Sequence, residues 1–193
     1  MSVYGVFGLP RAGKTTFLTA AARHSIEGKR FMRLKPHKQV LTTFPLKGCS
    51  KLDPYDIGKV DIQDSLLLID EISSFFDARN WKTFPECTRS WFQLHGHYKC
   101  DVIFCSQYWS DADARLRNLA ERYYLLEPSV IPHLSWVKPI DRYLGVKDGE
   151  IADTYDIGSF LSWTPIFRKK YYKYFDSYAQ TLKLDTLHTF DQW

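Results

Sequence analysis

Short runs of apolar residues alternate with segments of helical periodicity along the first part of the chain. The apolar runs VYGVF, QVLTTF, SLLLI, DVIFC and YYLL have the length of strands. Uninterrupted apolar runs of this kind are typical of parallel strands that are covered on both faces. Asp111 is the expected N-cap of the last helical segment. We therefore expect strands at residues 3–7, 39–44, 65–69, 101–105 and 123–126, and helices at 14–23, 88–98 and 111–121.

This alternation predicts an α/β fold, in which helices flank a mainly parallel sheet. Residues 47–64 are rich in Gly, Pro, Asp and Lys and are expected to form a loop. After Pro132 the chain carries prolines, tryptophans and tyrosines with little periodicity, and residues 166–177 fit a hairpin or an edge strand. The predicted organisation is a core at residues 1–131, followed by an aromatic-rich C-terminal extension at 132–193 that packs on it.

The composition indicates a soluble protein of a reducing cytoplasm. Of the 193 residues, 45% are hydrophobic, which is enough for one sizeable core, and the net charge of +4 permits a nucleic-acid or membrane-surface partner without requiring one. The start SVYGVFG has no basic region and no long apolar segment, so we expect no signal peptide. No apolar run approaches the ~20 residues of a spanning helix. The four cysteines show no C-x-x-C spacing, which predicts free thiols.

The segment GLPRAGKT, between the first predicted strand and the first predicted helix, matches the pattern G-x-x-x-x-G-K-[ST] in full. Glycines let the backbone wrap around phosphate oxygens, and the N-terminus of the following helix favours an anion there. The alternative is a chance glycine turn, but the strand–loop–helix setting favours a triphosphate-binding site. Lys14 would then reach the β- and γ-phosphates, Thr15 would bind Mg²⁺ and Thr16 would contact the α-phosphate. The predicted nucleotide-binding residues are Gly8, Pro10, Arg11, Ala12, Gly13, Lys14, Thr15 and Thr16.

Two other strand ends supply further candidates for this site. In LLLIDE, Asp70 would hold Mg²⁺ through a water and Glu71 would polarise the attacking water. The alternative is that both acids only cap the next helix, but the triphosphate site upstream favours the catalytic interpretation. DVIFC ends in Ser106 and Gln107, and Gln107 is either a turn residue or a sensor of the γ-phosphate.

These segments, in this order, resemble the ATPase domain of the zonular occludens toxin family, which includes filamentous-phage assembly and export proteins. The resemblance rests on GLPRAGKT, LLLIDE and WFQLHGHYKCDVIFCSQYWSDADARLRNLAERYY, and it covers roughly residues 1–130. The last block is the specific part, with an aromatic helix, a His before an Asp-led strand, a strand-end Gln and an Asp-x-x-x-Arg helix. The segment YYKYFDSYAQ resembles the C-terminal edge of that domain.

The resemblance implies a P-loop NTPase fold with an extra strand between the Walker A strand and the Walker B strand, which would place Gln107 beside the nucleotide. It implies Mg²⁺-dependent ATP hydrolysis that drives virion assembly, export or genome packaging. The expected setting is a homo-oligomer in the host cytoplasm or at the inner face of its membrane, with phage DNA and coat or membrane assembly proteins as partners. The matched residues are Lys14 and Thr15 for phosphate and metal, Asp70 and Glu71 for metal and water, Gln107 as sensor, and Arg117 as a helix arginine that could reach a neighbouring subunit's γ-phosphate.

The sequence departs from the family pattern at two points. The family usually has Arg directly before the His, whereas Gly96 precedes His97 here, so any role of that arginine is lost or moved. Members also commonly continue into a membrane-spanning segment and an outer domain, and no such segment is found in these 193 residues. The expectation is a cytosolic version, or one that relies on a separate membrane partner.

Three arginines are candidates for an arginine finger. Arg115 and Arg117 lie two residues apart on the predicted helix and would face different sides. One of them, or Arg11 in the glycine-rich loop, could stabilise the transition state from a neighbouring subunit. The alternative is that the two helix arginines are solvent-exposed charges.

Three other groups have simpler explanations or remain open. His95, His97 and Cys100 lack a fourth ligand at zinc-finger spacing, which favours ordinary core or surface histidines. SKLD at residues 50–53 resembles a guanine-reading element but precedes the metal aspartate and follows no strand, so ATP is favoured over GTP. RKKYYK at residues 168–173 mixes basic and aromatic residues as single-stranded-DNA binders do, and a strand with one solvated face explains it equally well.

The main hypothesis is therefore an oligomeric ATPase of a phage. A small nucleotide or nucleoside kinase is a second hypothesis, in which ARLR would form a lid and Asp70 or Glu71 would deprotonate an acceptor hydroxyl. The strand-end Gln107 and the lack of a clear acceptor pocket count against it. A third hypothesis is an ATP-gated scaffold with little hydrolysis, and the presence of Glu71 counts against that one.

Overall fold

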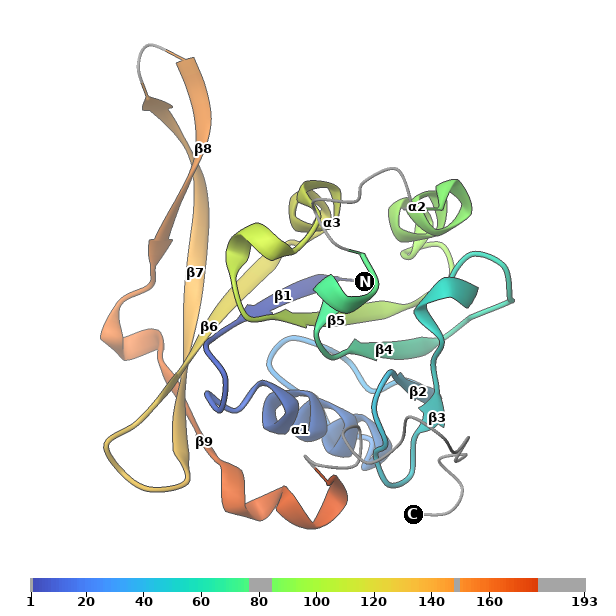
Figure 1. Cartoon of the computed structure of the whole chain (residues 1–193), viewed down its shortest axis with the longest axis horizontal. Helices are drawn as coiled ribbons and strands as arrows, with labels where there is room; N and C mark the ends of the chain where they lie inside the picture. Colours follow the sequence, from blue (N-terminus) through green and yellow to red (C-terminus); the bar gives the residue numbers. More distant parts are fainter. Residues whose placement is uncertain (1, 77–84, 148–149, 177–193) are drawn as a thin grey trace.

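The computed structural model describes residues 2–76, 85–147 and 150–176 of the chain. Their strands form one sheet in the order β3-β2-β4-β5-β1-β6-β7-β8, and β9 pairs with β7 (Figure 1). The strands are β1 Val3–Phe7, β2 Gln39–Thr42, β3 Ser50–Lys51, β4 Ser65–Ile69, β5 Asp101–Ser106, β6 Arg122–Pro128, β7 Leu134–Lys147, β8 Glu150–Ile157 and β9 Thr164–Phe167.

The part of the sheet from β3 to β6 is parallel, with β5 between β1 and β4. This is the position that the family resemblance implied for the strand after the aromatic helix. Helix α1 (Lys14–Ile26) covers one face, and α2 (Glu86–Leu94) and α3 (Ala114–Leu119) cover the other (Figure 1). The α/β prediction is therefore confirmed.

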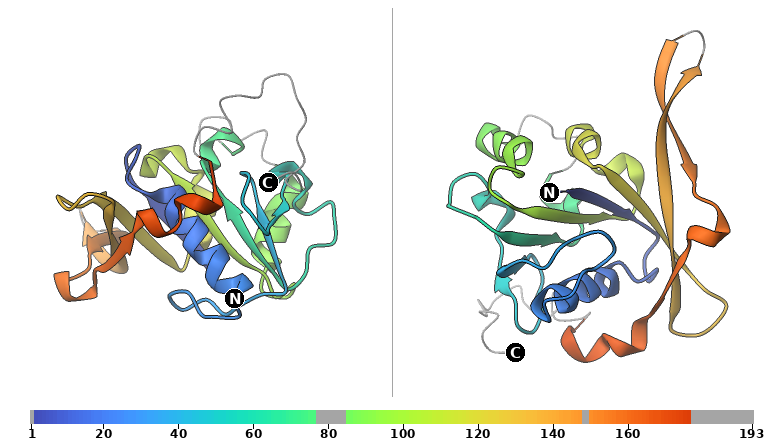
Figure 2. Two further views of the ribbon diagram at one scale, coloured as in Figure 1. Left: turned by 90° about the horizontal axis from the view of Figure 1, so that it is seen from below. Right: turned by 180° about the vertical axis from the view of Figure 1, so that it is seen from behind.

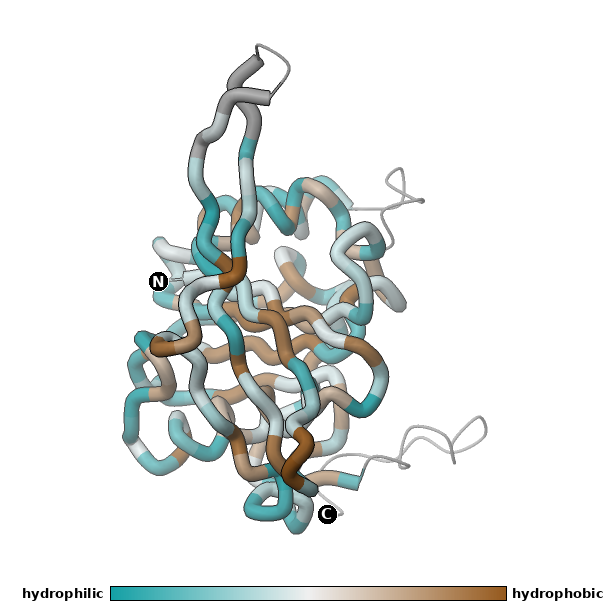
Figure 3. Tube along the Cα trace, turned by 90° about the vertical axis from the view of Figure 1, so that its left-hand side faces the viewer, coloured by the Kyte–Doolittle hydropathy of each residue, from teal (hydrophilic) through white to brown (hydrophobic). Residues whose placement is uncertain are grey.

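The apolar runs of the central strands are buried between these two layers. In β4, Leu66 and Leu68 pack in the core on the α1 face, whereas Leu67 and Ile69 pack in the core on the α2 and α3 face. Figure 3 shows the hydrophobic residues concentrated in the strands and the hydrophilic ones in the surrounding loops. Because burial of one such side chain stabilises the fold by about 1.5–3 kcal/mol, both faces of β4 contribute.

The predicted helices differ from the observed ones at their ends. The third helix begins at Ala114 and not at 111, because its N-cap is Asp113, whose side chain accepts a hydrogen bond from Arg115 N at 2.8 Å. Asp111, the predicted N-cap, instead closes a 3-10 helix, Trp109–Asp111. The two aspartates are equivalent by residue type, and the extended, buried Ala112 between them delays the start of the helix.

Two other predicted segments also differ from the observed ones. The helix predicted at 88–98 is observed as α2, which runs from Glu86 to Leu94. It ends before residue 98 because the chain turns after Leu94 and Lys99 adopts a φ of 57°. The loop predicted at 47–64 contains the short strand β3 and a 3-10 helix, Pro54–Asp56. No helix within the described part of the chain is long and apolar enough to cross a membrane.

The C-terminal extension contains a long β-hairpin that the sequence did not indicate. β7 pairs antiparallel with β6 and β8, so the extension continues the core sheet, and the hairpin projects beyond it (Figure 2). Pro139 and the charged residues of β7 hide the alternation that would have predicted the strand. Of the hairpin or edge strand expected at 166–177, only β9 is a strand. The 3-10 helices Arg168–Lys170 and Tyr172–Tyr174 follow it, and residue 177 lies outside the described residues.

All four cysteines lie within the described residues and are free thiols, as predicted. Cys100 and Cys105 are buried, Cys49 is half-buried and Cys87 is exposed. Burial raises the pKa of Cys49 to about 12 and that of Cys100 to about 11. Because the thiolate is the reactive form, these two thiols are expected to be inert at neutral pH.

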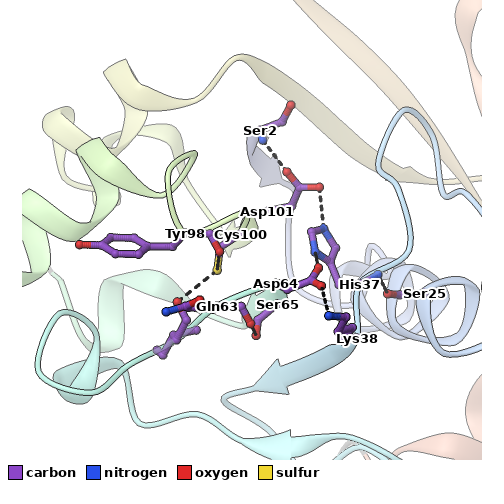
Figure 4. A network of polar contacts seen from close by, with 11 residues as sticks. Ser2, Ser25, His37, Lys38, Gln63, Asp64, Ser65, Tyr98, Cys100 and Asp101 are labelled. Carbon is purple, nitrogen blue, oxygen red and sulfur yellow. Dashed lines mark hydrogen bonds and ion pairs between the residues drawn. The ribbon is translucent and has the colours of Figure 1, made fainter.

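A buried polar network closes the edge of the sheet where the parallel strands begin (Figure 4). Asp101, the first residue of β5, accepts a hydrogen bond from Ser2 N at 2.5 Å, and its other carboxylate oxygen lies 2.8 Å from His37 Nε2. His37 Nδ1 lies 3.5 Å from Asp64 Oδ1. The side chains of His37 and Asp101 are only 3% and 5% exposed, so the network ties the N-terminus to the starts of β2, β4 and β5 inside the protein.

Candidate functional site

The glycine-rich loop between β1 and α1 needs its two glycines for different reasons. Gly13 has a φ of 104°, and a Cβ there would lie 3.0 Å from Ser135 Oγ and 3.1 Å from Arg168 Cδ. A Cβ at Gly8 would lie 2.7 Å from the carbonyl oxygen of Leu126. The first N–H groups of α1 have no acceptor within the helix. The loop therefore presents them at a helix N-terminus, where an anion is favoured.

Lys14 places its ammonium group inside this loop. Lys14 Nζ donates to the carbonyl oxygens of Gly8 at 2.6 Å and Leu9 at 3.3 Å, and the residue is only 9% exposed. A phosphate bound at the loop would replace these carbonyls as the acceptor. The cation is thus held next to the free N–H groups of α1.

Thr15 and Asp70, the two predicted metal ligands, are in direct contact. Thr15 Oγ1 donates to Asp70 Oδ2 at 2.7 Å, and Asp70 N donates to Thr43 Oγ1 at 3.0 Å, so β2, β4 and α1 meet here. Burial raises the pKa of the Asp70 carboxyl, while the hydrogen bond from Thr15 and the charge of Lys14 act in the opposite direction. A hydroxyl and a poorly solvated carboxylate are hard oxygen donors, and they fit Mg²⁺.

A cavity of about 590 Å³ opens in front of the loop. Of its lining residues, three are cationic and none is acidic, which favours a polyanion. Two parts of the chain contribute to its lining, the glycine-rich loop with the start of α1 and the C-terminal extension. The lining residues are Arg11, Gly13, Lys14, Thr15, Thr16, Arg168, Tyr172 and Phe175.

The other predicted loop residues do not line this cavity. Ala12 is buried in the core on the α1 face, and its carbonyl oxygen accepts a hydrogen bond from Ser135 Oγ at 2.7 Å. Gly8 is buried against β6, and Pro10 is exposed on the loop. These residues shape the loop, whereas Arg11 and Gly13 to Thr16 face the cavity.

Glu71 and Gln107 lie at neighbouring strand ends but do not line the cavity. Glu71 has a φ of 51°, and its Oε1 accepts a hydrogen bond from Ser73 Oγ at 2.8 Å. It occupies the N-cap position of the 3-10 helix Ile72–Ser74. Its side chain nevertheless makes no capping hydrogen bond to a backbone N–H of that helix. Gln107 follows β5, in which Ser106 pairs with Phe7, so it comes level with the start of the glycine-rich loop.

Arg117 lies on the other side of the sheet from α1. Its Nε donates to the carbonyl oxygen of Ala112 at 3.1 Å, and its guanidinium carbon lies 5.2 Å from the centre of the Trp109 ring. It does not line the cavity. A contact from Arg117 to a neighbouring subunit stays a prediction.

The C-terminal extension contributes to this cavity, which the sequence did not indicate. Arg168 Nη1 donates to the carbonyl oxygen of Arg11 at 2.8 Å, and Tyr172 and Phe175 also line the cavity. Binding of single-stranded DNA and a strand with one solvated face explained the basic and aromatic residues 168–173 equally well, and neither interpretation placed them at the glycine-rich loop. The available signal was the basic and aromatic composition itself, because cations attract phosphates and aromatic rings stack on bases.

The remaining candidates have structural roles. His95 Nδ1 lies 2.7 Å from the carbonyl oxygen of Phe92, within hydrogen-bonding distance. Cys100 Sγ donates to the carbonyl oxygen of Ile62 at 3.5 Å. Among the described residues, no group of three His, Cys, Asp or Glu could hold a metal ion. Asp53 accepts a hydrogen bond from Tyr55 N at 2.9 Å and so caps a 3-10 helix.

Asp70→Asn is expected to stabilise the nucleotide-free protein at pH 7 by about 0.5–2 kcal/mol. Burial disfavours the ionised carboxylate, and the amide oxygen of Asn can still accept the hydrogen bond from Thr15. Since the folded-state pKa of Asp70 is raised, the gain should vanish below about pH 3.9 and develop as the pH rises through the folded-state pKa. Urea denaturation at several pH values measures it, with the exposed Asp61→Asn as the control. A variant less stable than wild type at pH 7 would contradict this account.

The parallel sheet, the glycine-rich loop before α1 and the acid at the end of β4 define the P-loop NTPase fold. The family model "Zonular occludens toxin (Zot)" matches residues 20–133, which is more than half of the chain. The chain belongs to the zonular occludens toxin family.

The solved structures that are similar to this chain include a toxin domain and a viral packaging NTPase. The N-terminal domain of zonular occludens toxin from Neisseria meningitidis superimposes with a TM-score of 0.59 at 16% identity, over 91% of this chain and 98% of that one. The genome packaging NTPase B204 from Sulfolobus turreted icosahedral virus 2, in complex with AMPPCP, gives a TM-score of 0.48 at 11% identity, over 79% of this chain and 96% of that one. No curated protein matches the sequence.

Proposed function

We propose that this protein binds ATP with Mg²⁺ at the P-loop and hydrolyses it to drive virion assembly, export or genome packaging of a phage. The observation that carries the proposal is the 2.7 Å contact between Thr15 and Asp70, which joins the two halves of a P-loop site. The cationic cavity in front of the loop supports a polyanionic ligand. Membership of the zonular occludens toxin family supports the phage setting.

In this proposal, phosphate binding depends on groups that converge at the start of α1. The free N–H groups of the helix would donate to phosphate oxygens, and Lys14 would exchange the carbonyl of Gly8 for the β- and γ-phosphates. Thr15 and Asp70 would hold Mg²⁺, which neutralises charge on the phosphate oxygens when bound. Thr16 would contact the α-phosphate.

Hydrolysis would depend on Glu71 and Gln107 at the ends of β4 and β5. Glu71 would turn from Ser73 to orient the attacking water, and Gln107 would sense the γ-phosphate. Arg117 or Arg11 would act from a neighbouring subunit of a homo-oligomer. Phage DNA, coat or membrane assembly proteins would be the partners, in the host cytoplasm or at the inner face of its membrane.

Lys14→Ala is expected to lower Mg²⁺-dependent phosphate release by about 10²-fold or more, because it removes the cation that stabilises the transferred phosphoryl group. Phosphate release is measured with and without single-stranded DNA and with EDTA, while particle size is followed with ATP. The exposed Lys59→Ala serves as the matched control.

The same measurements separate the other hypotheses. A scaffold would oligomerise with ATP without releasing phosphate, and a kinase would need an acceptor substrate. Wild-type protein that binds no ATP would refute the proposal, as would a Lys14→Ala variant with full activity.

A further inference from the structure

Two parts of the chain line the cavity at the P-loop, and they differ in chemical character. The glycine-rich loop and the start of α1 contribute Arg11 and Lys14, whereas the C-terminal extension contributes the aromatic rings of Tyr172 and Phe175 beside Arg168, which is bonded to the loop. A nucleoside triphosphate has the same division, with a polyanionic chain at one end and a flat aromatic base at the other. Building on the proposed function, we infer that residues 168–175 form the base- and ribose-binding wall of the nucleotide site, with Tyr172 stacking on the base.

Packing contacts and hydrogen bonds hold the segment 168–175 in place. Ile166 and Tyr171 are buried in the core on the α1 face, at 8% and 7% exposure. Tyr174 accepts a hydrogen bond at its carbonyl oxygen from Lys47 N at 3.1 Å, and the Arg23 guanidinium lies 4.6 Å from the centre of its ring. Figure 2 shows these turns running beside α1. The wall is therefore a packed part of the domain.

Two hydrogen bonds join this wall to the P-loop itself. Arg168 Nη1 donates to the carbonyl of Arg11 at 2.8 Å, and Ser135 Oγ donates to the carbonyl of Ala12 at 2.7 Å. Both bonds occupy loop carbonyls and leave the N–H groups at the start of α1 for the phosphates. A triphosphate held there has its base in the remaining part of the cavity, where the aromatic rings lie.

Tyr172 is the ring best suited to receive the base. Its neighbours His133 and Phe175 meet it at interplanar angles of 76° and 82°, so neither is stacked on its face. Both rings line the cavity, but Tyr172 is 42% exposed, whereas Phe175 is partly buried and packs against the core. The cavity volume of about 590 Å³ lies within the range of small-molecule sites.

The test compares two Mg²⁺-bound ligands, ATP and inorganic tripolyphosphate, by calorimetric titration of the full chain. Tyr172→Ala is expected to weaken ATP binding about tenfold, as loss of one stacked ring does, and to leave tripolyphosphate binding unchanged. Tyr172→Phe keeps the ring and should bind ATP like wild type. Tyr143→Ala, which removes an exposed tyrosine of β7, is the matched control.

The outcomes distinguish this inference from the proposed function. Equal loss of ATP and tripolyphosphate binding in Tyr172→Ala, or full retention of both, would overturn the stacking role. The stacking role would also be overturned if Tyr172→Ala lost only the binding of a single-stranded oligonucleotide and still bound ATP like wild type. If wild-type protein binds neither ATP nor tripolyphosphate, the proposed function itself fails.

Discussion

Glu71→Gln is expected to lower the rate of ATP hydrolysis by about 10²–10⁴-fold while ATP binding is retained. The amide has nearly the shape of the carboxylate, and its oxygen can still accept the hydrogen bond from Ser73 Oγ. It cannot take a proton from water or orient it as a carboxylate does. The measurement is single-turnover hydrolysis, with ATP affinity determined in parallel by titration.

Glu86→Gln is the matched control, because Glu86 is exposed in the first turn of α2 and has no proposed role in the site. Its hydrolysis rate should equal that of wild type. If Glu71→Gln also hydrolyses ATP at the wild-type rate, the water is oriented by another group. If it loses ATP binding instead, Glu71 shapes the loop after β4 and has no part in the chemistry.

Asp101→Ala is expected to lower the free energy of unfolding by about 3 kcal/mol, a large share of the 5–15 kcal/mol typical of a domain. The substitution leaves Ser2 N and His37 Nε2 without their buried acceptor. Asp101→Asn keeps one acceptor oxygen and should lose less. Urea denaturation followed by circular dichroism measures the midpoint of each variant.

The exposed Asp61→Ala is the control, since its contact with Gln63 is on the surface and should change stability by less than about 0.5 kcal/mol. The network lies where the strands begin, and the P-loop lies where β1 ends. Folded Asp101→Ala should therefore bind ATP with the affinity of wild type. An Asp101→Ala protein as stable as wild type would show that the network contributes little to the fold.

The residues of the proposed nucleotide site were predictable to lie together where they belong to short contiguous segments. The glycine-rich loop, Asp70 and Glu71 each stand at the end of an apolar run, and such runs predict buried parallel strands. The carboxyl ends of parallel strands meet at one edge of the sheet, so the contact of Thr15 with Asp70 follows from the order of the strands. The long β7–β8 hairpin was not predictable in this way, because its residues show no clear alternation.

The α/β class, the P-loop and the acids that accompany it could be read from the amino-acid order alone, because they depend on local periodicity and on patterns of a few residues. Three features required the folded chain: which of two nearby aspartates caps α3, the position of Arg117 outside the cavity, and the presence of Arg168 and Tyr172 in the same cavity as the P-loop. Arg168 contacts Arg11, 157 positions earlier in the chain. Contacts over such distances are set by the packing of β7 and β9 on the sheet, and no local pattern records them.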